Sequence, residues 1–114
     1  MANPTEAAVQ EQFQMLRKGY LERLEEKIHQ MEELGGRLIQ GGGSADDLSG
    51  LLQLAHKLSG SGAIYGCKEL SQRAGDLEVF LRGLPPQIPL ITPSQTARLA
   101  EHLESLLTAY RQNA

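Results

Sequence analysis

The segment CKELSQRAGDLEVFLRGL, residues 67–84, has an apolar side chain at every third or fourth position. The positions are Cys67, Leu70, Ala74, Leu77, Leu81 and Leu84. This spacing places them on one face of an α-helix, which completes a turn in about 3.6 residues. Pro85 and Pro86 follow directly, end the helix and open a proline-rich connection. The segment therefore predicts an amphipathic helix over residues 66–83, which cannot bury its apolar stripe alone.

Three further segments each carry one apolar stripe of the same kind. They predict helices over residues 4–34, 44–62 and 93–111, and the first is stopped by the glycine run 41–43. The last two open with a capping box, a Ser or Thr followed three residues later by an acid or an amide. Short connections favour antiparallel neighbours. We therefore expect an all-α protein: an up-down antiparallel four-helix bundle with an N-terminal helical extension, in a single domain spanning residues 1–114.

The composition narrows the possible functions. The net charge of −3 and the pI near 5.6 argue against a nucleic-acid partner, whose binding surface needs an excess of basic residues. A single cysteine leaves no internal disulfide and no CxxC site. The three histidines fall on three different predicted helices, so we expect no bound metal. No apolar segment approaches the ~20 residues that span a bilayer, and no signal-peptide pattern opens the chain, so we expect a cytoplasmic protein without membrane contact.

His56 has a setting that folding alone does not explain. It lies about 120° from the centre of the apolar stripe on its predicted helix, so we expect an exposed ring. Its neighbours on that side of the helix are small or polar: Ser49, Gln53 and Gly60. Glycine costs about 1 kcal/mol relative to alanine inside a helix. Because Gly60 points outward, packing does not account for it, and we interpret it as room for a partner's backbone to approach His56.

The sequence around His56 resembles the signature of histidine-containing phosphotransfer (HPt) domains. That signature consists of a His followed closely by a Leu and by Gly-Ser, then a Gly, a Leu and a Leu-Glu pair. The matching positions are His56, Leu58, Gly60, Ser61, Gly66, Leu70, Leu77 and Glu78. The resemblance implies a four-helix bundle of about this length, in which His56 is phosphorylated at Nε2.

The resemblance also implies a role in a phosphorelay. His56 would accept a phosphoryl group from the aspartyl phosphate of a receiver domain and pass it to the aspartate of another. The expected partners are receiver domains of response regulators, of a hybrid sensor histidine kinase, or of both. The receiver would supply Mg²⁺, so this chain is expected to hold no cofactor and to act as a monomer. Imidazole suits the chemistry, since an ordinary pKa of about 6.5 leaves a nucleophilic ring nitrogen at neutral pH.

One position departs from the HPt signature. Where the family usually has a lysine that supports the phosphoryl charge, this chain has Ser59. Lys57 is the expected partial substitute, and Lys68 or Arg73 are further candidates. The expected supporting residues are Ser49, Gln53, Lys57, Ser59 and Gly60, and Gly62 joins the matched positions as a structural residue that faces the core.

Two alternatives remain open. One is a helical adaptor without chemistry, in which Gly60 would tolerate a large residue. The other is a degenerate HPt domain that binds receiver domains but transfers poorly, because Ser59 replaces lysine. Autonomous kinase activity is not expected, since the glycines at 36 and 41 have P-loop spacing but no Lys follows them. We expect transient binding to a receiver through an apolar patch around His56, built from the first and second helices.

Overall fold

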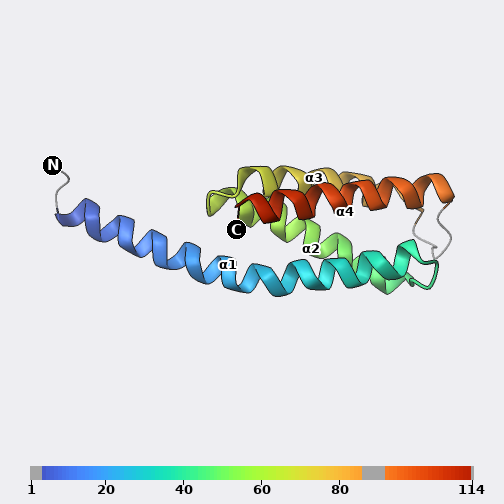
Figure 1. Cartoon of the computed structure of the whole chain (residues 1–114), viewed down its shortest axis with the longest axis horizontal. Coiled ribbons are helices and arrows are strands. Elements are labelled where there is room, and N and C mark those ends of the chain that lie inside the picture. Colours follow the sequence, from blue (N-terminus) through green and yellow to red (C-terminus); the bar gives the residue numbers. More distant parts are fainter. Residues whose placement is uncertain (1–3, 86–91, 114) are drawn as a thin grey trace.

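The computed structural model describes residues 4–85 and 92–113, in which all regular secondary structure is helical. The helices are α1 (Pro4–Ile39), α2 (Ala45–Ile64), α3 (Lys68–Arg82) and α4 (Pro93–Asn113). Consecutive helices run in opposite directions, and each packs against two neighbours in the cyclic order α1, α2, α3, α4 (Figure 1). The chain is therefore an all-α, up-down four-helix bundle, as its four apolar stripes predict.

The core is formed by one buried stripe from each helix. Its members include Leu24, Ile28 and Met31 from α1, Leu51, Ala55 and Leu58 from α2, Leu70, Ala74 and Leu77 from α3, and Leu99, Leu103 and Leu106 from α4. Among the described residues, no polar or charged side chain is buried with them. None of the helices in this part of the chain is long and apolar enough to cross a membrane.

Both predicted capping boxes are confirmed. At the start of α2, the backbone N–H of Asp47 donates to Oγ of Ser44 at 3.2 Å, and the N–H of Ser44 donates to Oδ2 of Asp47 at 2.9 Å. Thr92 and Gln95 make the same reciprocal pair before α4. These bonds satisfy backbone donors that have no partner within the helix, so they set where each helix begins. The proline-rich connection predicted after α3 continues into residues 86–91, which lie outside the described residues.

Helix α1 runs past the boundary predicted at residue 34 and ends at Ile39, just before the glycine run 41–43 that is predicted to stop it. The helix continues through Gly35 because this glycine serves a helix–helix contact. Gly35 is buried, and a Cβ there would collide with the side chain of Leu103 on α4. The helix ends only where Gly41 adopts a φ of +84° and the N–H of Gly42 bonds the carbonyl of Arg37 at 3.1 Å.

The first part of α1, residues 4–19, projects past the other helices at the end of the bundle where α2 turns into α3 (Figure 1). This is the expected N-terminal extension, and it contributes to a longest dimension of 59 Å. Tyr20 is the first buried residue of α1. Its ring stacks on that of Tyr65 with centroids 4.4 Å apart, and its hydroxyl lies 2.9 Å from Oγ of Ser61. These contacts hold the base of the extension against the α2–α3 turn.

Candidate functional site

His56 lies on the exposed side of α2, as the helical spacing predicts. Its side chain is 67% exposed, and its Nδ1 lies 2.8 Å from Oε2 of Glu78 on α3. Glu78 is far less exposed, at 16%. The α2–α3 packing thus brings together two residues separated by 22 positions in the chain, and one of them fixes the orientation of the other.

Glu78 also binds Arg82, one turn further along α3. Nη2 and Nε of Arg82 lie 2.7 and 3.0 Å from Oε2, the same oxygen that contacts His56. The Arg82 guanidinium, and after it the His56 ring, hold the pKa of Glu78 below its ordinary value of 4.5. The carboxyl is therefore ionised at neutral pH, and an ionised carboxylate can only accept hydrogen bonds.

This carboxylate decides which nitrogen of His56 carries the proton. Since Glu78 accepts, Nδ1 of the neutral ring must donate, and the lone pair is left on Nε2. A ring nitrogen with a lone pair on an exposed side chain is a positioned nucleophile. The site therefore consists of a nucleophile and the residue that fixes its tautomer, contributed by two neighbouring helices.

A shallow cavity of about 290 Å³ opens beside the ring. It is lined by Ser49, Leu52, Gln53, His56, Lys57 and Arg82. Two of these side chains, Lys57 and Arg82, are cationic, which makes the cavity suited to an anion. Sequence reasoning missed Arg82, although its position four residues after Glu78 on one helix face was an available signal.

Gly60 leaves open space next to His56. A Cβ built on it would meet no atom within 4 Å, so no contact in the described structure requires a glycine here. Gly60 lies one helical turn after His56, on the same side of α2. The surface beside the ring is therefore bare backbone, which a second protein can approach closely.

Ser59 does not take part in this surface. It is half-buried, and its Oγ would lie 3.2 Å from a Cβ placed on Gly75 of α3. Its carbonyl accepts a hydrogen bond from the hydroxyl of Ser71. Gly62 packs against the same helix, because a Cβ there would lie 3.1 Å from Cβ of Ser71. Small residues at these positions let α2 and α3 approach closely enough for Glu78 to reach His56.

The remaining motif residues shape the bundle. Leu58, Leu70 and Leu77 are buried, and Gly66 turns the chain between α2 and α3 with a φ of +80°. Ser61 bonds the hydroxyl of Tyr20 on α1. These residues hold the helices that carry His56 and Glu78, and none of them lines the cavity beside the ring.

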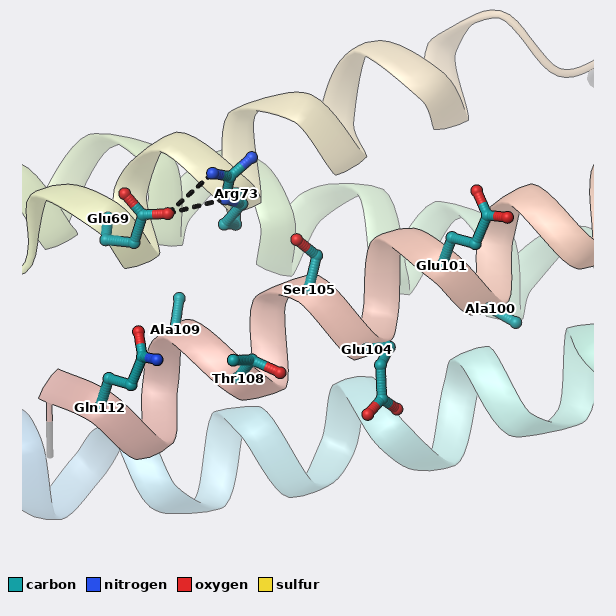
Figure 2. A pocket seen from close by; sticks show the side chains of 9 residues that line it. All are labelled: Glu69, Arg73, Ala100, Glu101, Glu104, Ser105, Thr108, Ala109 and Gln112. Carbon is teal, nitrogen blue, oxygen red and sulfur yellow. Dashed lines mark hydrogen bonds and ion pairs between the residues drawn. The ribbon is translucent and has the colours of Figure 1, made fainter.

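The two cations considered as substitutes for the missing lysine lie elsewhere. Arg73 binds Glu69 at 2.8 Å and lines a groove between α3 and α4 (Figure 2). Lys68 lines another hollow between α2 and α3, which Ser59 and Glu78 also line. Neither of these two candidates lines the cavity of His56, whereas Arg82 does.

Two large apolar side chains are exposed on the helices that carry the site. Outside the α1 extension, the large apolar side chains exposed in the described residues are Ile64 on α2 and Val79 on α3, at 68% and 73%. Ile64 lies two turns after His56. Val79 directly follows Glu78. The apolar patch expected from the first and second helices stays a prediction.

One known protein family matches this chain. The family model of the Hpt domain matches residues 15–113, which is most of the chain. Searches among curated proteins and among solved structures give no match. The matched range includes α2, α3, α4 and the part of α1 that begins at residue 15, and it leaves out most of the α1 extension. The chain belongs to the Hpt domain family, whose members transfer phosphoryl groups in two-component phosphorelays and interact there with receiver domains.

Proposed function

We propose that His56 accepts a phosphoryl group from the aspartyl phosphate of one receiver domain and donates it to the aspartate of another. The observation that carries the proposal is the bond between Nδ1 of His56 and Glu78, which directs the lone pair of the exposed ring to Nε2. A fixed tautomer on a rigid helix removes much of the orientational cost of an attack by a flexible side chain.

The transfer balances without any group beyond the two proteins and the receiver's Mg²⁺. Nε2 attacks the phosphorus, a P–N bond forms, the acyl P–O bond breaks and the electron pair leaves with the receiver's carboxylate. The ring then has substituents on both nitrogens and gains positive charge, which the ionised carboxylate of Glu78 faces. The second transfer reverses these steps on the aspartate of another receiver.

Lys57 and Arg82 fit the role of stabilising the phosphoryl oxygens. Both line the cavity beside the ring, and Arg82 is held there through its bond to Glu78. Arg82 and His56 contact one oxygen, so the guanidinium lies within two hydrogen-bond lengths of the ring. In this proposal these cations replace the lysine that the family usually has at position 59.

The receiver would dock over the bare backbone at Gly60. Ile64 lies one turn after Gly60 on α2, and Val79 lines a hollow with Ser59, the neighbour of Gly60 in the chain. These two exposed side chains would supply a small apolar contact, as a transient complex requires. A small, exposed contact suits a relay protein, because it must release one receiver before it meets the next.

The decisive experiment uses a receiver domain charged with ³²P-labelled acetyl phosphate and Mg²⁺. We expect the wild-type chain to gain an acid-labile, alkali-stable label and His56→Gln to gain none. His29→Gln is the matched control, because His29 is also exposed and also faces a carboxylate, that of Glu33 at 3.1 Å. Equal labelling of the His56→Gln variant would refute the proposal. Binding of the receiver without labelling of the wild type would instead identify a degenerate domain.

A further inference from the structure

The α1 extension, residues 4–19, carries an apolar stripe that nothing in the described structure covers. Val9, Phe13 and Leu16 are 59%, 42% and 60% exposed. They are spaced by four and three residues, and a further four residues lead to Tyr20, which is buried in the bundle. The stripe is therefore the continuation of the core-facing side of α1 beyond the end of the other helices (Figure 1).

A projecting helix whose apolar stripe is uncovered is only weakly stable by itself. A segment of about four turns is only marginally helical in water, and most helical stability in proteins comes from burying an apolar face. Most of the extension also precedes residue 15, where the match to the Hpt domain begins. Its stripe thus belongs to this chain rather than to the phosphotransfer module that the family shares.

The charges of the extension are ordered along the helix. Glu6 and Glu11 come first, and Arg17 and Lys18 follow. Glu6 and Arg17 are separated by about three full turns, so both flank the stripe on the same side. Nε of Arg17 donates to the carbonyl of Tyr65 at 2.9 Å, which holds this guanidinium at the base of the extension.

This order makes the segment complementary to itself in one orientation. Two copies laid antiparallel bring Glu6 of each copy toward Arg17 of the other, and they also oppose the two helix dipoles. In a parallel pair, Glu6 and Arg17 would each lie level with their own counterpart, so neither would meet an opposite charge.

We propose that the α1 extension pairs antiparallel with the same segment of a second copy of this chain, through Val9, Phe13 and Leu16. The pair has two-fold symmetry, and the two bundles lie at its opposite ends. His56 of each copy lies on α2 within its own bundle, so both phosphotransfer surfaces stay open. Two short helix stripes bury less surface than a standard interface. The dimer is therefore weak and forms in a concentration-dependent way, in contrast to the monomer expected from the sequence.

Sedimentation velocity of the full chain over a wide concentration range tests the pairing. We expect the sedimentation coefficient of the wild type to rise with concentration and that of Phe13→Glu to stay at the monomer value. Met15→Glu is the matched control, because Met15 is 73% exposed but lies about 100° around the helix from Leu16. Circular dichroism establishes that each variant keeps a folded bundle. A wild type that is monomeric throughout, or a Met15→Glu variant that dissociates as readily as Phe13→Glu, would overturn the proposal.

Spin labels test the orientation. Labels on Gln12→Cys lie near the centre of an antiparallel pair, whereas labels on Thr5→Cys lie near its ends. We expect a short distance for position 12 and a distance about 20 Å longer for position 5. The native Cys67 is buried and does not take up the label. Short distances at both positions would indicate a parallel pair and overturn the proposal. So would loss of receiver binding in Phe13→Glu without any self-association of the wild type, which would assign the stripe to the receiver.

Discussion

His56 and Arg82 bind the same carboxylate oxygen. Nδ1 of His56 lies 2.8 Å from Oε2 of Glu78, and Nη2 of Arg82 lies 2.7 Å from that atom. In the proposed function, Glu78 would have two roles: it would orient the imidazole, and it would hold Arg82 in the cavity beside the ring. Both functions depend on α2 and α3 lying close together, which the small residues Ser59, Gly62 and Gly75 allow.

Replacing Arg82 should make phosphorylated His56 less stable. We expect Arg82→Gln to shorten the lifetime of phosphorylated His56 about two- to fivefold, as for the loss of one partly exposed charge contact. The lifetime is measured by following the loss of ³²P label from the purified phosphoprotein. Arg73→Gln is the control, because Arg73 is also an α3 arginine paired with a carboxylate, but it faces α4.

A rescue experiment separates this role from a purely structural one. Arg82→Lys keeps a positive charge on a residue that lines the cavity, and we expect the lifetime to stay close to that of wild type. If Arg82→Lys is no longer-lived than Arg82→Gln, Arg82 does not act through its charge on the phosphoryl group.

Removing Glu78 should change the tautomer of His56. In the wild type we expect the neutral ring to carry its proton on Nδ1, because the ionised carboxylate accepts from it. In Glu78→Ala the proton should shift toward Nε2, the usual preference of a free imidazole, and the rate of phosphotransfer should fall. The ¹⁵N chemical shifts of the ring report the tautomer directly. Unchanged shifts in Glu78→Ala would show that the carboxylate does not select the nucleophilic nitrogen.

Substitutions of Gly60 should affect stability and phosphotransfer in different ways. Because a Cβ there meets open space, Gly60→Ala is expected to raise the free energy of unfolding by about 0.5–1 kcal/mol through helix propensity. Gly60→Gln should likewise leave the fold intact but slow phosphotransfer, since its side chain would stand where the receiver approaches. Urea unfolding and the labelling assay measure the two effects. Gly36 is the matched control, a helical glycine with equally open space on α1, where glutamine should leave transfer unchanged. Phosphotransfer by Gly60→Gln as rapid as that of wild type would show that the receiver does not approach over Gly60.

At acid pH, the carboxylates of Asp47 and Glu78 should lose their contribution to the stability of the fold. Arg37, and after it the backbone N–H of Ser44, lower the pKa of Asp47, as Arg82 and His56 lower that of Glu78. A carboxyl whose folded-state pKa lies below its unfolded-state value stabilises the fold above the unfolded-state value. That contribution is lost as the pH falls from the unfolded-state value through the folded-state value.

Urea unfolding should therefore show wild-type stability decreasing below about pH 4.5. Asp47→Asn and Glu78→Gln should be less stable than wild type at pH 7, and this difference should shrink as the pH falls through the folded-state pKa values. A deficit that is the same at pH 7 and at pH 3 would contradict this assignment.

Much of the bundle can be predicted from local pattern. The apolar spacing of Leu70, Leu77 and Leu81 predicts α3 because one helix face must be buried, and the reciprocal bonds at Ser44 and Thr92 follow from residue types alone. The glycine run 41–43 likewise predicts where α1 stops. The contact made by Gly35 could not be predicted in this way, because only the approach of Leu103 from α4 shows why no side chain fits there.

The order of residues along the chain determines that His56 lies on the outer side of a helix and that a glycine leaves the backbone uncovered one turn away. Both properties depend only on helical geometry and residue type. The side chains that contact the His56 ring depend on which helix packs beside α2 and on how far the two helices are shifted along their axes. Hence Glu78 and Arg82 reach His56 across the α2–α3 contact, whereas Arg73, on the same helix, turns to α4. Helical periodicity acts over a few residues and can be seen in a sequence, but the meeting of side chains from two helices is set by how closely the whole bundle packs.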